Sequence, residues 1–362
     1  MPKIDSLLTR HADVPKSDAP LWSGPGGRGS NGGVTFSLLS RFLTCRERFR
    51  LYAIEGLRPA DVWNHRLGYG ELWHTAEQSL AARQPWEKPL TAFAKELCRR
   101  YPTQQEQIDH WHCVCRAQFP IYVRHWQEHP DLREQQPLLQ EHVFDISYRL
   151  PSDRVIRLRG KWDSVDLVGN KVWLQENKTK ADIRPLELQR QLSFDLQTML
   201  YMVALERHQD APLAGVRYNV VRRPLSGGKG TITRHKGTKN KPEESRAEFY
   251  ARLAGIIENA PDDFFMRWAV TVTAGDIKRF RDECLDPILE ELCRWYDAQR
   301  SLRDRGHKPF DSYRVECRHW RHPFGCVNTL DEYGSSDLDS YLESGSMVGL
   351  SRTDTLFSEL QS

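Results

Sequence analysis

Two runs near the middle of the chain alternate between polar and apolar residues as β-strands do. The first covers residues 155–163, and the second covers residues 171–176 and includes the β-prone residues Val172 and Trp173. A Gly-Asn pair at 169–170 separates the two runs, and such a pair is typical of a tight turn. The sequence therefore predicts a β-hairpin.

The other periodic segments are mostly helical. Apolar residues near helical spacing predict a helix at 36–54, and residues 70–129 look helical in pieces that prolines interrupt. The remaining predicted elements are three strands within 138–178, a long helix at 187–208, a buried strand at 216–221, and amphipathic helices at 246–259 and 276–304, the last kinked by Pro287. This order predicts an α+β fold with a small mixed sheet flanked by helices.

Composition divides the chain into one folded region with two different ends. Residues 1–34 are polar and rich in Gly, Pro and Ser, so we expect a disordered leader. Residues 328–362 are acidic and rich in Ser, which predicts a loose tail. Residues 35–327 would form the folded domain, and a chain of 362 residues is long enough to bury a sizeable core.

The predicted hairpin carries the most informative chemistry. Asp163 closes its first strand, and Glu176-Asn-Lys178 closes its second, so the hairpin can bring the two carboxylates together. The two-residue period of a strand places Glu176 and Lys178 on one face. Carboxylate oxygens suit Mg²⁺ or Mn²⁺, and such an ion with a nearby lysine suits hydrolysis of a phosphodiester bond. The alternative is a surface hairpin with ordinary solvated charges, because short patterns also arise by chance.

Further motifs surround this hairpin in a fixed order. They are residues 37–45 with Arg48-Phe49, residues 70–74 ending in His74, the acidic Glu141, residues 160–163, residues 176–178, and Gln197 with Tyr201. Together they resemble the RecB-like branch of the PD-(D/E)XK nucleases, which includes the CRISPR-associated RecB-like exonucleases and phage-type exonucleases. The resemblance extends from about Phe36 to Cys326.

This resemblance implies a restriction-endonuclease-like core with a helical insertion at about 75–130. It implies a metal-dependent DNA nuclease, more an exonuclease or a single-strand- or flap-preferring enzyme than an endonuclease, in DNA repair, recombination, phage replication or defence. Asp163 and Glu176 would hold Mg²⁺ or Mn²⁺ with His74, and Lys178 would stabilise the reacting phosphate. Two alternatives remain open: a non-catalytic DNA-binding module of the same fold, and a nuclease subunit that acts only with a helicase or recombination partner.

Two groups of residues would contact DNA. By the resemblance, Gln197 and Tyr201 share a helix face that meets the active site and the strand. Arg222 and Arg223 open a basic, Gly-rich segment that reads as a flexible loop at 224–245, and such a loop suits phosphate contacts. The alternative for this segment is a solvated loop without a ligand. The net charge is only +3, so local clusters must carry any argument for nucleic-acid binding.

The cysteines pose a separate question. Many relatives bind a [4Fe–4S] cluster with one early and three late cysteines, and Cys45, Cys317 and Cys326 match three of these positions. Trp320 replaces the fourth, and tryptophan cannot ligate iron. We therefore expect no metal there, with the iron–sulfur cluster, or zinc held with a histidine, as alternatives. The other cysteines are expected to be reduced thiols.

Nothing in the sequence suggests a membrane protein. No apolar stretch approaches the roughly 18–20 residues of a membrane span, and the N-terminus lacks the apolar core of a signal peptide. A cytoplasmic location is therefore the expectation.

Overall fold

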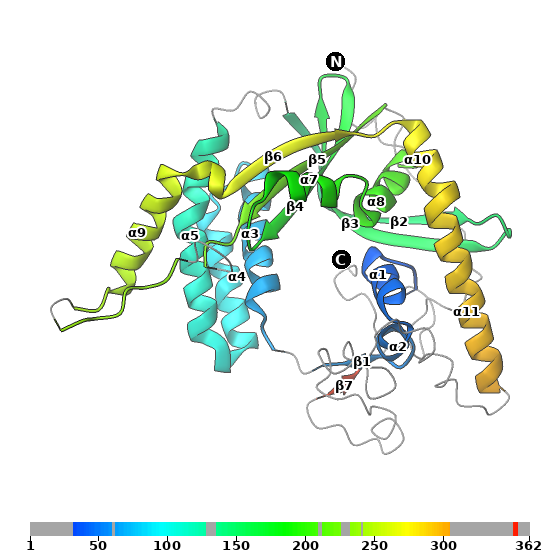
Figure 1. Ribbon diagram of the computed structural model, residues 1–362, viewed down its shortest axis with the longest axis horizontal. Coiled ribbons are helices and arrows are strands. Elements are labelled where there is room, and N and C mark those ends of the chain that lie inside the picture. Colours follow the sequence, from blue (N-terminus) through cyan, green and yellow to red (C-terminus); the bar gives the residue numbers. More distant parts are fainter. Residues whose placement is uncertain are drawn as a thin grey trace.

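A five-stranded mixed sheet forms the centre of the fold (Figure 1). The computed structural model describes residues 32–59, 62–127, 135–208, 212–225, 232–239, 242–304 and 350–353. The strands, in their order across the sheet, are β2 (Gln135–Arg149), β3 (Val155–Val168), β4 (Lys171–Lys180), β5 (Leu213–Arg222) and β6 (Phe265–Thr271). All neighbours are antiparallel except β4 and β5, which run parallel. The α+β fold class and the mixed sheet are therefore confirmed.

Strands β3 and β4 form the predicted hairpin. Val168 lies opposite Lys171, and Gly169 in the turn has a φ of +62°, which glycine adopts without strain. The ladder between the two strands ends where Ser164 lies opposite Gln175. Farther along, β4 continues to pair with β5, whereas β3 pairs with Val34, whose N–H donates to the Arg157 carbonyl at 2.7 Å. The sheet is therefore forked between β3 and β4.

One group of helices covers one end of the sheet. It consists of α3 (His65–Ala81), α4 (Glu87–Arg100), α5 (Gln105–Gln127) and α9 (Arg246–Asn259) (Figure 1). An aromatic core joins these helices, and Trp73 packs edge-on against both Phe119 and Tyr122. Helix α3 also contacts β2 and β4, so this helical group reaches the fork of the sheet.

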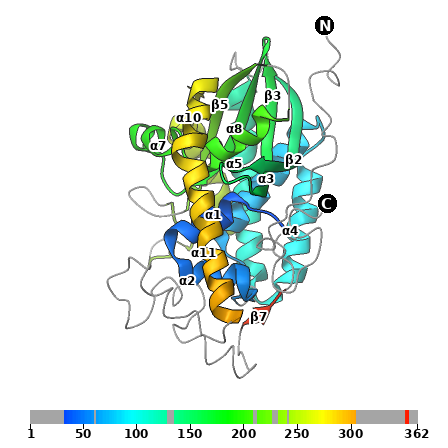
Figure 2. The same cartoon turned by 90° about the vertical axis from the view of Figure 1, so that its right-hand side faces the viewer.

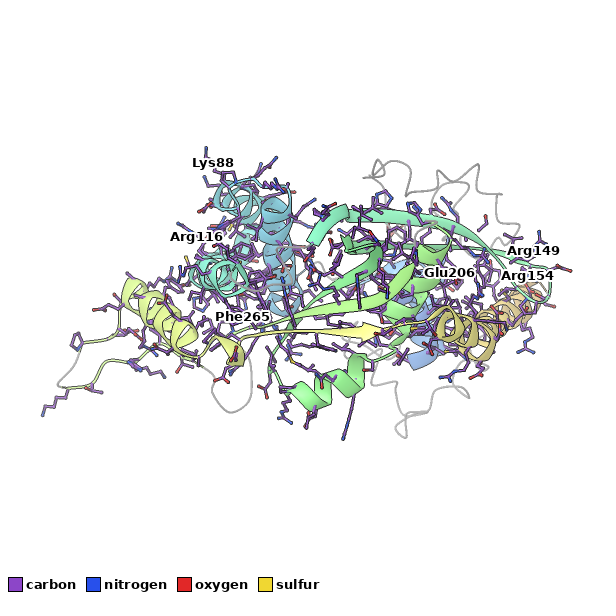
Figure 3. The ribbon with its side chains drawn as sticks, turned by 90° about the horizontal axis from the view of Figure 1, so that it is seen from above. Lys88, Arg116, Arg149, Arg154, Glu206 and Phe265 are labelled. Atoms are coloured by element: carbon purple, nitrogen blue, oxygen red, sulfur yellow. The ribbon has the colours of Figure 1, made fainter. Side chains whose placement is uncertain are left out.

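A second group of helices packs with the other part of the sheet. It consists of α1 (Phe36–Thr44), α2 (Arg46–Phe49), α8 (Leu196–Glu206), α10 (Ala274–Phe280) and α11 (Asp286–Asp304). Figure 2 shows α11 standing in front of α1 and the sheet. Seen from above, Arg149 and Arg154 lie beside α11, far from Lys88 and Arg116 on the first group (Figure 3). Arg154 fixes this end through an ion pair with Asp297 at 2.7 Å.

Short segments complete the described part of the chain. They are α7 (Pro185–Leu192), the π-helical turns Arg50–Ile54 and Arg281–Leu285, the 3-10 turns Pro102–Gln104 and Pro261–Asp263, and β1 (Leu57–Arg58), which pairs with β7 (Ser351–Arg352). Among the described helices, none is long and apolar enough to cross a bilayer.

The prediction of a single helix at 187–208 is wrong, because the helix is interrupted between α7 and α8. Phe194 has a φ of +58°, which no helical residue can have. Asp195 then caps α8, and its side chain accepts from the N–H groups of Gln197 and Thr198. Tyr218 on β5 fixes the break from outside, since its hydroxyl donates to the Leu192 carbonyl.

Other elements agree with the expectations only in part. The segment 276–304 is helical throughout, but the π-helical turn Arg281–Leu285 interrupts its α-helical form just before Pro287. Pro120, expected to interrupt a helix, lies inside α5. Strand β6 was not predicted, because its half-buried residues alternate only weakly.

Several predicted features lie largely outside the described residues. They are the leader at 1–34 apart from its last three residues, the tail at 328–362 apart from 350–353, and parts of the loop at 224–245. Cys317, Trp320 and Cys326 also lie outside them.

Candidate active site

The fork between β3 and β4 exposes the end of a strand ladder, and Asp163 occupies it. The Asn177 N–H of β4 donates to Asp163 Oδ2 at 2.8 Å, so this carboxylate takes the place of the next ladder hydrogen bond. The side-chain alternation of β3 also slips here, because Trp162 and Val165 both belong to the core that contains α8 although they are three residues apart. The slip turns Asp163 out of that core.

Glu141 reaches the same place from β2. It lies between the pairs Gln140–Ser164 and His142–Trp162 and therefore stands across from Asp163, although the ladder skips this pair. Its φ of +47° is rare for a residue with a side chain and breaks the alternation of β2 at the same level as that of β3. Both strands are therefore distorted where their carboxylates meet, as is common at functional sites.

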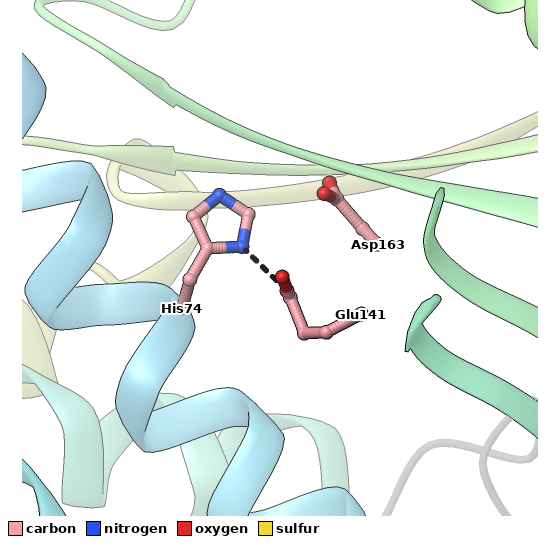
Figure 4. Close-up of side chains that lie close together, drawn as sticks. All are labelled: His74, Glu141 and Asp163. Carbon is pink, nitrogen blue, oxygen red and sulfur yellow. Dashed lines mark ion pairs between the residues drawn. The ribbon is translucent and has the colours of Figure 1, made fainter. Parts of the chain in front are cut away.

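His74 completes the cluster from α3, and the three side chains point toward one another (Figure 4). One ligand atom from each of His74, Glu141 and Asp163 lies within 4.8 Å of the other two. His74 Nδ1 is 3.5 Å from Glu141 Oε1, and Lys161 forms an ion pair with the same glutamate. We call His74, Glu141 and Asp163 the fork trio.

Glu176, Lys178 and Gln197 form a second cluster on the face of β4 that meets α8. Lys178 Nζ forms an ion pair with Glu176 and donates to Gln197 Oε1 at 2.7 Å. Gln197 Nε2 in turn donates to Glu176 Oε1 at 2.8 Å. The Gln197 amide thus holds both charged partners, and we call these three residues the lysine cluster.

Burial and the nearby charges shift the pKa values of the side chains at this fork. Burial raises the pKa of Glu176 to about 7, and Asp163 adds to the rise. Burial likewise raises the pKa of Asp163. Burial lowers the pKa of His74, but the carboxylates of Asp163, Glu141 and Glu77 outweigh it and raise that pKa to about 9. Such a crowd of buried carboxylates favours a bound cation.

The side chains present fit a divalent metal ion. Glu176 is 2% exposed, and its Oε2 is buried without a hydrogen-bond partner, which is costly for a carboxylate unless a ligand reaches it. Oxygen donors from carboxylates with one imidazole suit Mn²⁺ or Mg²⁺. The sequence pattern predicts His74, Asp163 and Glu176 as ligands but marks Glu141 only as an acidic position of the family.

Two aromatic residues close the floor of the site. A Cβ placed on Gly160 would lie 2.5 Å from Phe144 and 3.0 Å from Tyr201, so only glycine fits beneath these rings. Tyr201 is 8% exposed, packs edge-on against Phe144, and its hydroxyl lies 3.4 Å from Gln197 Nε2. The structure thus brings Gln197 and Tyr201 together, with Gln197 alone reaching the charged groups.

The two arginines predicted to contact DNA lie on the sheet side of the basic segment. Arg222 and Arg223 are 8% and 7% exposed, and the Arg222 guanidinium lies 5.1 Å from the Phe264 ring. The Arg223 N–H donates to the Lys180 carbonyl at 2.8 Å, which places Arg223 at the end of the strand that carries Lys178. Their contact with DNA stays a prediction.

Cys45 lies buried between α1 and α2. The expected relation of Cys45 to Cys317 and Cys326, which lie outside the described residues, also stays a prediction. The described Cys98, Cys113, Cys115, Cys284 and Cys293 form no disulfides.

Comparisons with known proteins place the chain in a family. A family model described as the PD-(D/E)XK nuclease superfamily matches residues 34–284, which include both clusters of the fork. No curated protein matches the chain. A solved structure titled "Crystal structure of SSO0001" is 11% identical, with 64% of this chain and 79% of that chain covered, but its TM-score of 0.24 is too low to carry an argument. The chain belongs to the PD-(D/E)XK nuclease superfamily.

Proposed function

We propose that this protein is a divalent-metal-dependent deoxyribonuclease whose active site is the fork between β3 and β4. One observation carries the proposal: the fork trio lies at the end of the strand ladder, beside a buried lysine held between Glu176 and Gln197. A superfamily of metal-dependent nucleases is the natural setting for this arrangement.

The residues of the fork divide the work. His74, Glu141, Asp163 and the unpartnered oxygen of Glu176 would hold Mg²⁺ or Mn²⁺, and the imidazole favours Mn²⁺. A bound ion of this kind polarises a phosphoryl oxygen and lowers the pKa of its water. Lys178 stabilises the charge that develops on the phosphate, and Gln197 fixes the direction of its ammonium group.

The finer part of the proposal concerns the substrate. We infer exonuclease or single-strand- and flap-preferring action, because the order of the motifs from His74 to Tyr201 resembles that of the RecB-like branch. DNA is the substrate in this proposal, and a helicase or recombination protein is a candidate partner. A role in repair, recombination or defence in the cytoplasm is the setting we expect.

A metal panel with end-labelled linear DNA and circular DNA, each single- and double-stranded, tests the proposal. We expect hydrolysis of linear DNA only with Mg²⁺ or Mn²⁺, and loss of activity in Lys178→Ala. Lys171→Ala, on an exposed position of the same strand, is the matched control and should keep full activity. Full activity in Lys178→Ala would refute the proposed role of this lysine.

Other outcomes of the same panel identify the alternatives. Cleavage of closed circles would show endonuclease action. Binding without cleavage under every metal would favour a non-catalytic DNA-binding module, unless adding a helicase partner restores cleavage.

A further inference from the structure

A cavity of about 670 Å³ opens between the sheet and the C-terminal ends of α3 and α5. Its floor includes Gln140 of β2, Ser164 of β3 and Gln175 of β4, and its walls include Glu77 of α3 with Tyr122 and Trp126 of α5. Gln175 alternates with Leu174 and Glu176, which face α8, so the floor belongs to the opposite face of the sheet.

The cavity adjoins the fork trio because the same elements carry both. Glu77 lies about one helical turn beyond His74, Gln140 precedes Glu141, and Ser164 follows Asp163. Asn177 also lines the cavity, and its N–H bonds directly to Asp163. A ligand in the cavity would therefore sit beside the site of hydrolysis.

The floor of the cavity is rich in groups that both donate and accept hydrogen bonds. Gln140 Nε2 donates to Ser164 Oγ, and Gln175 Nε2 donates to Asn177 Oδ1 at 3.2 Å. Each amide keeps further donor or acceptor capacity after these bonds. The Trp126 ring, with the Arg267 guanidinium 4.5 Å from its centre, adds a flat wall. Amides beside a flat wall suit a planar polar ligand.

A network of buried polar side chains supports the wall of the cavity. Glu77 Oε1 accepts from Tyr122 and Asn219, and Arg267 Nη2 donates to Tyr122 at 2.8 Å. Glu77 also takes part in a side-chain hydrogen bond with Trp73, and Arg267 Nη1 lies buried beside this network. The network fixes the polar groups of the cavity wall, and a polar ligand suits such a wall better than an apolar one.

We propose that this cavity is a nucleoside pocket that receives the base of one nucleotide next to the scissile phosphate. A nucleobase offers flat faces for the aromatic wall and both donors and acceptors along its edge. The proposal rests on the proposed nuclease function, and it adds a contact that positions the strand through a base.

Filling the cavity tests the proposal without removing any polar group. Ala81→Trp places a bulky ring at the cavity, whereas Ala82→Trp places the same ring on an exposed neighbour that does not line it. Val123→Phe fills the cavity from α5 and serves if Ala81→Trp does not fold. The affinity for single-stranded oligonucleotides is measured with Ca²⁺ in place of Mg²⁺, and the oligonucleotides are checked to be intact afterwards. Each oligonucleotide of the series carries one abasic site at a different position along the strand.

The expected pattern is a position-specific one. Wild type and Ala82→Trp should bind about tenfold more weakly when the abasic site falls at one position, the order of a lost base contact. Ala81→Trp should bind the intact strand about tenfold more weakly and lose this sensitivity. The proposal would be overturned if Ala81→Trp or Val123→Phe lost as much affinity at the abasic position as the wild type does. It would also be overturned if the wild type lost no affinity at any abasic position. Because binding is the readout, a protein that fails to cleave DNA would refute the nuclease proposal separately.

Discussion

The two clusters of the fork differ in how complete they are. The lysine cluster is bonded within itself, because Gln197 bonds both Lys178 and Glu176 and the glutamate is almost fully buried, and among these groups Glu176 Oε2 alone lacks a hydrogen-bond partner. The fork trio is looser: the His74 side chain is 29% exposed and lies 3.5 Å from Glu141. The protein thus prearranges the group that would stabilise the phosphate, and leaves clustered carboxylates where a cation would complete the site.

The largest expected effect comes from substitutions at Asp163 and Lys178, which should affect metal binding differently. Asp163→Ala should abolish both Mn²⁺ binding and hydrolysis, a loss of at least about a thousandfold in rate, because the other ligands cannot hold the ion alone. Lys178→Ala should lose about a hundredfold or more in rate while it still binds Mn²⁺. Calorimetric titration with Mn²⁺ measures metal binding, and single-turnover cleavage measures the rate. Equal loss of Mn²⁺ binding in both variants would mean that the two residues do not have different roles.

A smaller effect tests whether Glu141 belongs with the metal. Glu141→Gln keeps the shape but removes the charge that faces His74 and Asp163. Metal affinity should fall about 10- to 100-fold, the range found when groups that support metal ligands are changed. Glu187→Gln, on exposed α7, is the matched control. Unchanged Mn²⁺ affinity in Glu141→Gln would leave Glu176 as the third ligand instead.

The pH dependence of metal binding follows from the same charges. Without metal, Glu176 has a pKa of about 7 and His74 a pKa of about 9, so both carry protons at neutral pH to a degree that free groups do not. A metal must displace these protons, and its apparent affinity should therefore rise with pH through this range. Titration in two buffers of different ionisation enthalpy counts the protons released. Affinity that is independent of pH from 6 to about 9 would contradict the assignment of these ligands.

The smallest effect concerns the floor that supports both clusters. Gly160→Ala should lower the free energy of unfolding by about 1–3 kcal/mol, because its Cβ would overlap Phe144. Gly255→Ala, where a Cβ meets nothing within 4 Å on α9, should instead raise it by about 0.5–1 kcal/mol. Urea unfolding measures both. If Gly160→Ala left the free energy of unfolding unchanged, the rings above Gly160 would have to move aside freely.

Local signals explain how much of this site the sequence could predict. The hairpin follows from a two-residue turn and alternating strands, so the residue pattern alone predicts that Asp163 lies near Glu176 and Lys178. The break at Phe194 depends on Tyr218, and the position of Glu141 depends on a left-handed residue within a strand. Both are tertiary effects that no periodicity encodes, and for that reason the sequence does not predict them.

The most direct test of the account is to locate Mn²⁺ in crystals of the protein by its anomalous scattering. We predict a peak among His74, Glu141 and Asp163, and no such peak in Asp163→Ala crystals. A peak elsewhere on the chain, or none in protein that still cleaves DNA, would contradict the claim that the fork is the catalytic metal centre.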